Sequence, residues 1–380
     1  MRRTIIMTSV LAFSLALFVP LTPANTIVYG TAVQDLSPEE AAAYKLWFEA
    51  NGAKDYTKAM ELAKAYLEKF PSGKYADYLK TKWIPGMAPM FFNKAVESKN
   101  VPEIIRIGKE VLARDADNLD YLTALVVQIR TLELFANPAN FAHAAEATEF
   151  SERAIRLIEA GKTPTGADPQ KFNKNVTLAY LHQTLAVVFE HDKNIDKALA
   201  EYDKAAQLEP SNPAFFFHCG RIHNDKYAAR AQKYDELQKK SEAAQKTSDD
   251  LQKKVQAVPE ADRNAGTKPD VKSLLAQAKT AQDEAKAAQE QEKAALEEVN
   301  GQADAVITCW ARFLGLTVEK NPWGATRAQI EKAFTDLYKY RHNDSTDGLQ
   351  KLIDQNRPSP SASNGDAASN GDASAAVSKR

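Results

Sequence analysis

The sequence predicts an all-α protein made of short paired helices, with one much longer helical hairpin near the C-terminal end. Apolar residues recur at spacings of three and four along most of the chain, while alternating stretches rich in β-branched residues are scarce. Asn, Gly and Pro interrupt this pattern, as at Asn51-Gly52 and Asn137-Pro138. Two long stretches beyond residue 226 are rich in Ala, Gln, Lys and Glu, which are strong helix formers.

The composition limits the classes of protein to which the chain can belong. The chain is 44% hydrophobic and 26% charged, which suits a folded protein, and its formal net charge of -1 gives no general attraction for nucleic acid. It has 2 cysteines, so at most one disulfide can form. Stability must therefore come from packing rather than from a cysteine framework.

Residues 1–32 are predicted to form a signal peptide. Met1-Arg2-Arg3 is positively charged, and the run from Thr4 to Leu21 is apolar and uncharged, which is the layout of a secretory signal. Small residues place cleavage near residue 24 or 32. An uncleaved anchor stays open as an alternative, because about 18 apolar residues is the lower limit for a membrane span. In both cases we expect the rest of the chain outside the cytoplasm, in the periplasm or the extracellular space.

The clearest internal repeat unit covers residues 179–212. Its first helix carries Leu185, Ala186 and Phe189, its second carries Ala198, Tyr202 and Ala205, and Pro210 follows. The small residues allow two helix backbones to approach closely, and the large ones fill the seam. This length and pattern resemble the tetratricopeptide repeat (TPR), a helix pair of about 34 residues. His182 departs from the family, which prefers an aromatic residue there.

Less regular units precede and follow this one. Residues 55–71, 100–116 and 141–159 have the pattern of second helices of earlier pairs, and a fifth pair opens at Pro213. Residues 33–225 are thus predicted to form a TPR-like α-solenoid of about five helix pairs. The intervals exceed those of a standard TPR, so an irregular α-solenoid stays open as an alternative.

Residues 226–302 are predicted to form an antiparallel coiled-coil hairpin inserted into the fifth pair. Heptad positions hold Tyr227, Tyr234, Ser241 and Ser248 in the first arm, and mostly alanines in the second. Lysines and arginines exceed acidic residues in the first arm and are outnumbered in the second, so the arms should attract each other. Each arm would be about 45 Å long. A disordered charged linker is the alternative.

After the hairpin, residues 303–356 are predicted to complete the last pair and to add capping helices, because solenoids need a covered end. An apolar helix around Trp310 and Phe313 would pack in the pair, and a helix at about 325–340 would cap it. From residue 357 to residue 380, Ser, Asn, Gly, Asp and Ala dominate. That composition predicts a disordered tail.

No catalytic motif is evident in the sequence. It contains no phosphate-binding glycine motif, no GxSxG, no HExxH and no CxxC. We therefore expect no enzymatic activity, no cofactor, no small-molecule substrate and no metal. Cys219 and His223 lie four residues apart with His218 beside them, a spacing that could hold a metal, but these are inward positions of a TPR first helix and favour core packing.

The two cysteines are predicted to lie close together. If the hairpin interrupts one repeat, Cys219 and Cys309 belong to the two helices of the same fifth pair, and both should face its seam. A disulfide requires Cα atoms within about 7 Å, which a close helix crossing near Gly220 would allow. Buried free thiols are the alternative, because cysteine is often a small core residue.

The resemblance to TPR proteins implies a concave surface, formed by the first helices, that holds a segment of a partner protein. It places Tyr180, Gln183 and Val187 of the fourth pair and Phe217 and Arg221 of the fifth on this surface. These faces could instead pack on the hairpin or face water.

The predicted function is an exported protein-protein interaction scaffold, or adaptor, for partners in the cell envelope or among secreted proteins, acting through the groove or the hairpin. The alternative is a membrane-anchored structural or assembly factor of the envelope. In that case the N-terminal segment is retained and makes the only expected membrane contact.

Overall fold

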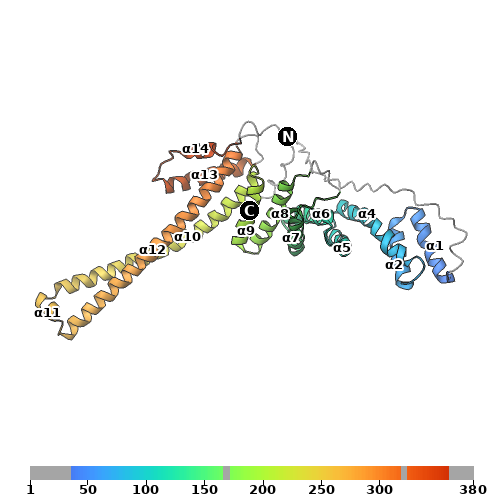
Figure 1. The fold of residues 1–380 in the computed structure, drawn as a ribbon. Coiled ribbons are helices and arrows are strands. Elements are labelled where there is room, and N and C mark those ends of the chain that lie inside the picture. Colours follow the sequence, from blue (N-terminus) through green and yellow to red (C-terminus); the bar gives the residue numbers. More distant parts are fainter. Residues whose placement is uncertain (1–35, 166–171, 318–322, 359–380) are drawn as a thin grey trace, which may run out of the picture. The chain divides into compact units, whose positions relative to one another are not determined.

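The computed structural model describes residues 36–165, 172–317 and 323–358 (Figure 1). Within these ranges every regular element is helical and none is a strand, so the predicted all-α class is confirmed. The described residues form two compact units, 36–188 and 189–358. The signal segment predicted at 1–32 and the tail from residue 359 lie outside the described residues.

The first unit is a succession of short helices. They are α1 (Pro38–Gly52), α2 (Tyr56–Lys69), α3 (Ala76–Tyr78), the π-helical turn η1 (Leu79–Trp83), α4 (Ile84–Glu97), α5 (Val101–Leu112), α6 (Leu119–Ile129), the π-helical turn η2 (Arg130–Leu134), α7 (Ala144–Glu159) and most of α8 (Lys174–His191). Helix α1 packs on α2, α4 on α5, α5 on α6 and α6 on α7. In these four pairs, helices that follow each other in the chain are neighbours in space.

Side-chain caps explain where several of these helices begin. Asp55, Asn100 and Asn118 each accept a hydrogen bond from the backbone N–H three residues later, at 3.1 to 3.2 Å. Each bond satisfies a donor that has no partner inside the helix. The predicted second helices at 55–71, 100–116 and 141–159 correspond to α2, α5 and α7.

The N-terminal core forms where α1, α2 and η1 meet. Ala59, Ala63 and Tyr66 of α2 are buried there with Trp47 of α1 and Trp83 of η1. The rings of Trp47 and Trp83 lie edge to face with centroids 5.4 Å apart. The two alanines let α1 approach α2 closely, while the aromatic rings fill the remaining space.

The second unit contains the two longest helices. It holds the end of α8 and then α9 (Ile195–Leu208), α10 (Pro213–Ala257), α11 (Glu260–Ala265), α12 (Pro269–Leu316), α13 (Gly324–Arg341) and α14 (Leu349–Asp354). Helices α10 and α12 lie side by side and form the arm in Figure 1, α9 packs on α10, and α13 and α14 pack on α12. Residues 226 and 302 mark no break, because both long helices continue from the core into the arm.

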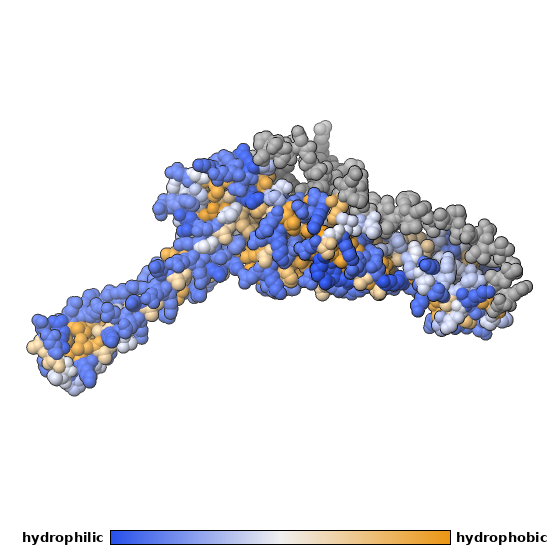
Figure 2. Space-filling model, in the orientation of Figure 1, coloured by the Kyte–Doolittle hydropathy of each residue, from blue (hydrophilic) through white to orange (hydrophobic). Residues whose placement is uncertain are grey.

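The seam of the arm holds small side chains. Ser241 and Ser248 of α10 are buried, as are Ala278, Ala281, Ala285, Ala288 and Ala295 of α12. The outer faces are largely hydrophilic along the shaft (Figure 2). One ion pair joins the arms near their base, with Arg230 Nε 3.2 Å from a carboxylate oxygen of Glu298. The connection between the arms contains the short helix α11.

In the described ranges, no helix combines the length and the apolar character needed to cross a membrane.

Candidate functional site

The predicted groove residues belong to two different units. Tyr180, Gln183 and Val187 lie on the part of α8 in the first unit, and Phe217 and Arg221 lie on α10 in the second. Each group has its own surroundings.

In the first unit, Tyr180 and Gln183 surround the guanidinium group of Arg130, the first residue of η2. The guanidinium carbon lies 4.7 Å from the ring centroid of Tyr180 and 4.3 Å from that of Phe135. Nη2 donates a hydrogen bond of 2.7 Å to Oε1 of Gln183. Gln183 is only 1% exposed, so it holds Arg130 and does not line an open surface. Tyr180 and Val187 remain partly exposed.

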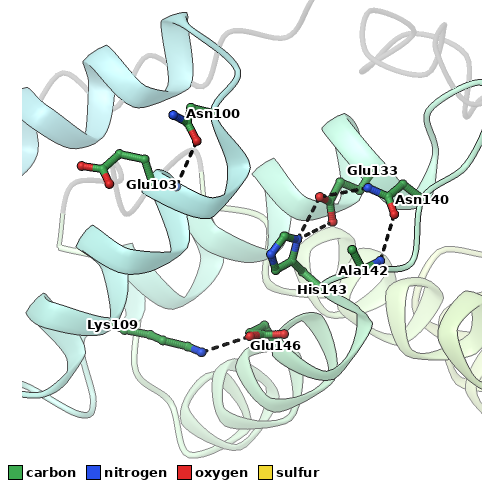
Figure 3. Close-up of polar contacts among 8 residues, drawn as sticks. All are labelled: Asn100, Glu103, Lys109, Glu133, Asn140, Ala142, His143 and Glu146. Carbon is green, nitrogen blue, oxygen red and sulfur yellow. Dashed lines mark hydrogen bonds and ion pairs between the residues drawn. The ribbon is translucent and has the colours of Figure 1, made fainter.

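The same π-helical turn carries a buried carboxylate (Figure 3). Glu133 is 5% exposed, and its oxygens lie 2.9 and 3.0 Å from Nδ1 of His143. Asn140 donates to Oε1 of Glu133 at 3.3 Å, and its own Oδ1 accepts the backbone N–H of Ala142 at 3.0 Å. A buried carboxylate requires such partners. These contacts fasten the loop between η2 and α7, which contains the cis peptide bond Asn137-Pro138.

Residue spacing did not point to Arg130, Phe135 or Glu133 as members of this cluster. A π-helical turn adds a residue to the helical repeat, so the apolar spacing that marks a helix face is lost within it. The Asn137-Pro138 pair, which was recognised as a helix boundary, was the available signal that an irregular segment begins nearby.

In the second unit, the structure corrects the expectation for Phe217. Its side chain is 5% exposed and packs in the core, with ring centroids 5.8 Å from Phe313 and 5.1 Å from Trp323. It therefore does not line a free groove. The reason is that α12 and the segment before α13 cover this face of α10.

Arg221 is half-buried in an acidic environment. Its Nη2 donates to Oε1 of Glu190, and its Nη1 lies 3.6 Å from a carboxylate oxygen of Asp225. The other oxygen of Glu190 accepts the hydroxyl of Tyr202 at 3.5 Å. Arg221 is thus occupied by partners within its own unit.

His218 lies next to this ion pair. Its ring is stacked on Tyr202, with centroids 5.1 Å apart and planes inclined by 5°. Burial, together with the positive charge of Arg221, lowers the pKa of His218 to about 3. The imidazole is therefore neutral at physiological pH and behaves as a core ring rather than as a cation.

The two cysteines meet where α10 and α12 leave the core. Cys219 and Cys309 form a disulfide with Cα atoms 6.0 Å apart, and both residues are buried. His223 lies one helical turn after Cys219, and its Nδ1 is 2.9 Å from Oε1 of Gln302. The two sulfurs and an imidazole nitrogen of His223 all lie within 4.8 Å of one another. Cys219 and Cys309 thus lie on two helices that pack side by side, as expected if both helices belong to one pair.

Comparison with known proteins gives no further guidance: no protein-family model matches the chain, and no curated protein matches it. The function is inferred from the residues alone.

Proposed function

We propose that this chain is an exported, non-enzymatic scaffold with a TPR-like α-solenoid, which binds segments of envelope or secreted proteins. The observation that carries the proposal is a turn that recurs in three helix pairs. In each, a lysine adopts a left-handed backbone conformation, with φ of 59° at Lys54, 54° at Lys99 and 62° at Lys193. An Asp or Asn follows each lysine and begins the next helix.

The hydrogen bonds of these turns are also equivalent. The N–H of Asp55, Asn100 and Asn194 donates to the carbonyl oxygen five residues earlier, at 3.0, 3.0 and 2.8 Å. The residue four positions after each of them is fully buried, namely Ala59, Ile104 and Ala198. The same bond also ends α7 and α13, from Lys162 to Leu157 and from Asp344 to Lys339, because it is a common way to close a helix. What distinguishes the three turns is the left-handed lysine, which is unfavourable on its own, followed each time by an Asp or Asn that begins the next helix. This recurrence supports a repeated structural unit.

The turns connect α1 to α2, α4 to α5 and α8 to α9. The α6–α7 pair lies between the second and third of these and has the η2 turn and the Asn140 loop instead. On this basis we place the first helix of each pair, α1, α4, α6 and α8, on the partner-binding side. This follows the geometry of helical-repeat proteins, in which repeated helices create an extended binding surface.

These first helices carry exposed apolar side chains. Leu46 on α1 is 53% exposed and Val127 on α6 is 45% exposed, while Met87 and Met90 on α4 and Val187 on α8 are partly exposed. Methionine adapts to different partner shapes. The proposed ligand is an apolar or amphipathic protein segment, and the buried Phe217 is no longer part of the proposed surface.

Site-specific photocrosslinking in the native host tests this proposal. A photoreactive amino acid replaces Leu46, Val127 or Val187, and matched controls replace Glu110 and Glu152, which are exposed on the second helices α5 and α7. We expect the first-helix positions to crosslink to a common partner that the control positions do not reach. Equal crosslinking from both sets of positions, or none from either, would refute the proposed surface.

A membrane-anchored assembly factor is the second candidate, and the apolar run from Thr4 to Leu21 favours it. In that case the arm of α10 and α12 serves as a spacer. Mass spectrometry of the mature protein separates the two candidates. A mature chain that begins near residue 24 or 32 supports the soluble scaffold, and one that still begins near Met1 overturns it.

A further inference from the structure

The base of the arm brings together three side chains that are good ligands for thiophilic metal ions. Cys219 and His223 lie on successive turns of α10, and Cys309 faces them from α12. Their potential ligand atoms lie within 4.8 Å of one another. Two thiolates and an imidazole form the protein ligand set of known zinc sites that keep a fourth position for water. In the described structure the two sulfurs are joined to each other.

The backbone would hold these ligands in place without the disulfide. Gly220 follows Cys219 in α10, and Trp310 follows Cys309 in α12. Because Gly220 has no side chain, the ring of Trp310 lies directly against α10: a Cβ added at Gly220 would be 2.1 Å from Cδ1 of Trp310. Trp310 is also part of the core cluster of this unit. The close approach of the helices is therefore set by packing, and reduction of the bond would leave both thiols beside each other.

The histidine is already oriented. Nδ1 of His223 pairs with Oε1 of Gln302 at 2.9 Å, which favours a proton on Nδ1 and leaves Nε2 with a free lone pair. A hydrogen bond from the second ring nitrogen is the usual support of a metal-binding histidine. Whereas both cysteines are buried, His223 is partly exposed, so an ion could enter from its side.

We propose that Cys219, His223 and Cys309 form a redox-gated site that binds one Zn²⁺ ion when the disulfide is reduced. An external dithiol supplies two electrons and two protons: its own sulfurs become a disulfide, and the Cys219–Cys309 bond becomes two thiols. When Zn²⁺ binds, each thiol releases its proton to solvent and becomes a thiolate ligand. Nε2 of His223 is the third ligand, and water takes the fourth position. The oxidised form has no thiolates and does not bind the ion. This site is independent of the proposed partner surface.

The test uses the full-length protein in its oxidised form and after reduction by a small dithiol, which is then removed without oxygen. Co²⁺ serves as a spectroscopic probe, because its bonds to thiolates give a charge-transfer absorption band, and Zn²⁺ affinity is measured by competition with a chromogenic chelator. We expect one Zn²⁺ per reduced chain, a Co²⁺-thiolate band and neither signal in the oxidised chain. Affinity should rise with pH, because binding releases protons.

Variants identify the ligands. His223→Ala should weaken Zn²⁺ binding by more than tenfold, and Gln302→Ala, which removes the support of the imidazole, by about tenfold. His342→Ala alters a histidine of the same unit outside the cluster and should leave affinity unchanged. Far-UV circular dichroism verifies that each variant is folded. The proposal is overturned if the reduced chain, with both thiols verified by titration, gives no Co²⁺-thiolate band. It also fails if the oxidised chain binds equally well, or if His223→Ala binds as tightly as the unaltered protein.

Discussion

Replacing Gly220 with alanine tests how α10 and α12 are held together at the base of the arm. A Cβ at this position would lie 2.1 Å from Cδ1 and 2.2 Å from Nε1 of Trp310. The indole is 3% exposed and belongs to the core, so it cannot swing into solvent without opening the helix packing. The alanine must push the two helices apart or force Trp310 into a strained rotamer.

The expected cost follows from two opposing effects. Overpacking a well-packed core destabilises by about 1–3 kcal/mol, and a contact this short places Gly220→Ala near the upper end. Alanine favours a helix interior over glycine by about 1 kcal/mol. The free energy of unfolding should therefore fall by about 2 kcal/mol. Gly301→Ala is the matched control, because Gly301 lies within α12 with nothing within 4 Å of an added Cβ. It should stabilise by up to about 1 kcal/mol.

Urea unfolding of the oxidised proteins, followed by circular dichroism, measures both effects. A double-mutant cycle adds a direct check: when Trp310→Ala has removed the indole, Gly220→Ala should become neutral or stabilising. If Gly220→Ala is as stable as Gly301→Ala in the presence of Trp310, the close approach does not define this interface. Packing would then not explain how the two cysteines are held close together.

Three further predictions concern pH, the first unit and the arm. The pKa of His218 is lowered to about 3 in the folded state, below its value of about 6.5 in the unfolded state. The unfolded chain therefore binds a proton first as the pH falls. The contribution of His218 to the free energy of unfolding is complete above pH 6.5 and decreases below pH 6.5 by up to ~1.4 kcal/mol per pH unit. His218→Phe should flatten this dependence in urea titrations between about pH 6.5 and pH 5, and an unchanged slope would contradict the assignment. Gly108→Ala should lower the free energy of unfolding of the first unit by about 1–2 kcal/mol, because the added Cβ would lie 2.6 Å from the side chain of Leu125. A variant more stable than the unaltered protein would show that Leu125 can move aside without cost. Replacing residues 231–297 with a short glycine linker should leave a remainder that still unfolds cooperatively on heating. The reason is that the core cluster of the second unit contains no residue from this range. A loss of cooperativity would show that the arm is part of that core.

The general course of the chain could be read from local patterns. The pattern of residues 55–71 predicted the helix that is now α2, and the spacing of Ala198, Tyr202 and Ala205 predicted the buried face of α9. Helical periodicity repeats every few residues, so a short window contains enough information to identify a helix and its apolar face. The heptads beyond residue 226 indicated the seam of the arm for the same reason.

The functional residues were harder to predict, because exposure depends on contacts between distant segments. Phe217 occupies a position that the repeat pattern assigns to the groove, but Phe313 and Trp323, far along the chain, cover it. Gln183 was likewise expected on a surface, but it is buried and accepts a hydrogen bond from Arg130. No local pattern contains these partners.

The sequence by itself determined the helical class, the pairing of short helices and the small-residue seam of the long arm, since each of these follows from residue spacing within one or two helices. Only the tertiary structure decided which predicted groove residues are covered, that Arg130 and Glu133 lie on a π-helical turn, and that His223 faces Cys219 and Cys309 together. The physical reason is that these features depend on the packing of segments separated by tens of residues. At that range, close-packed side chains allow few arrangements, but local periodicity does not specify which one forms.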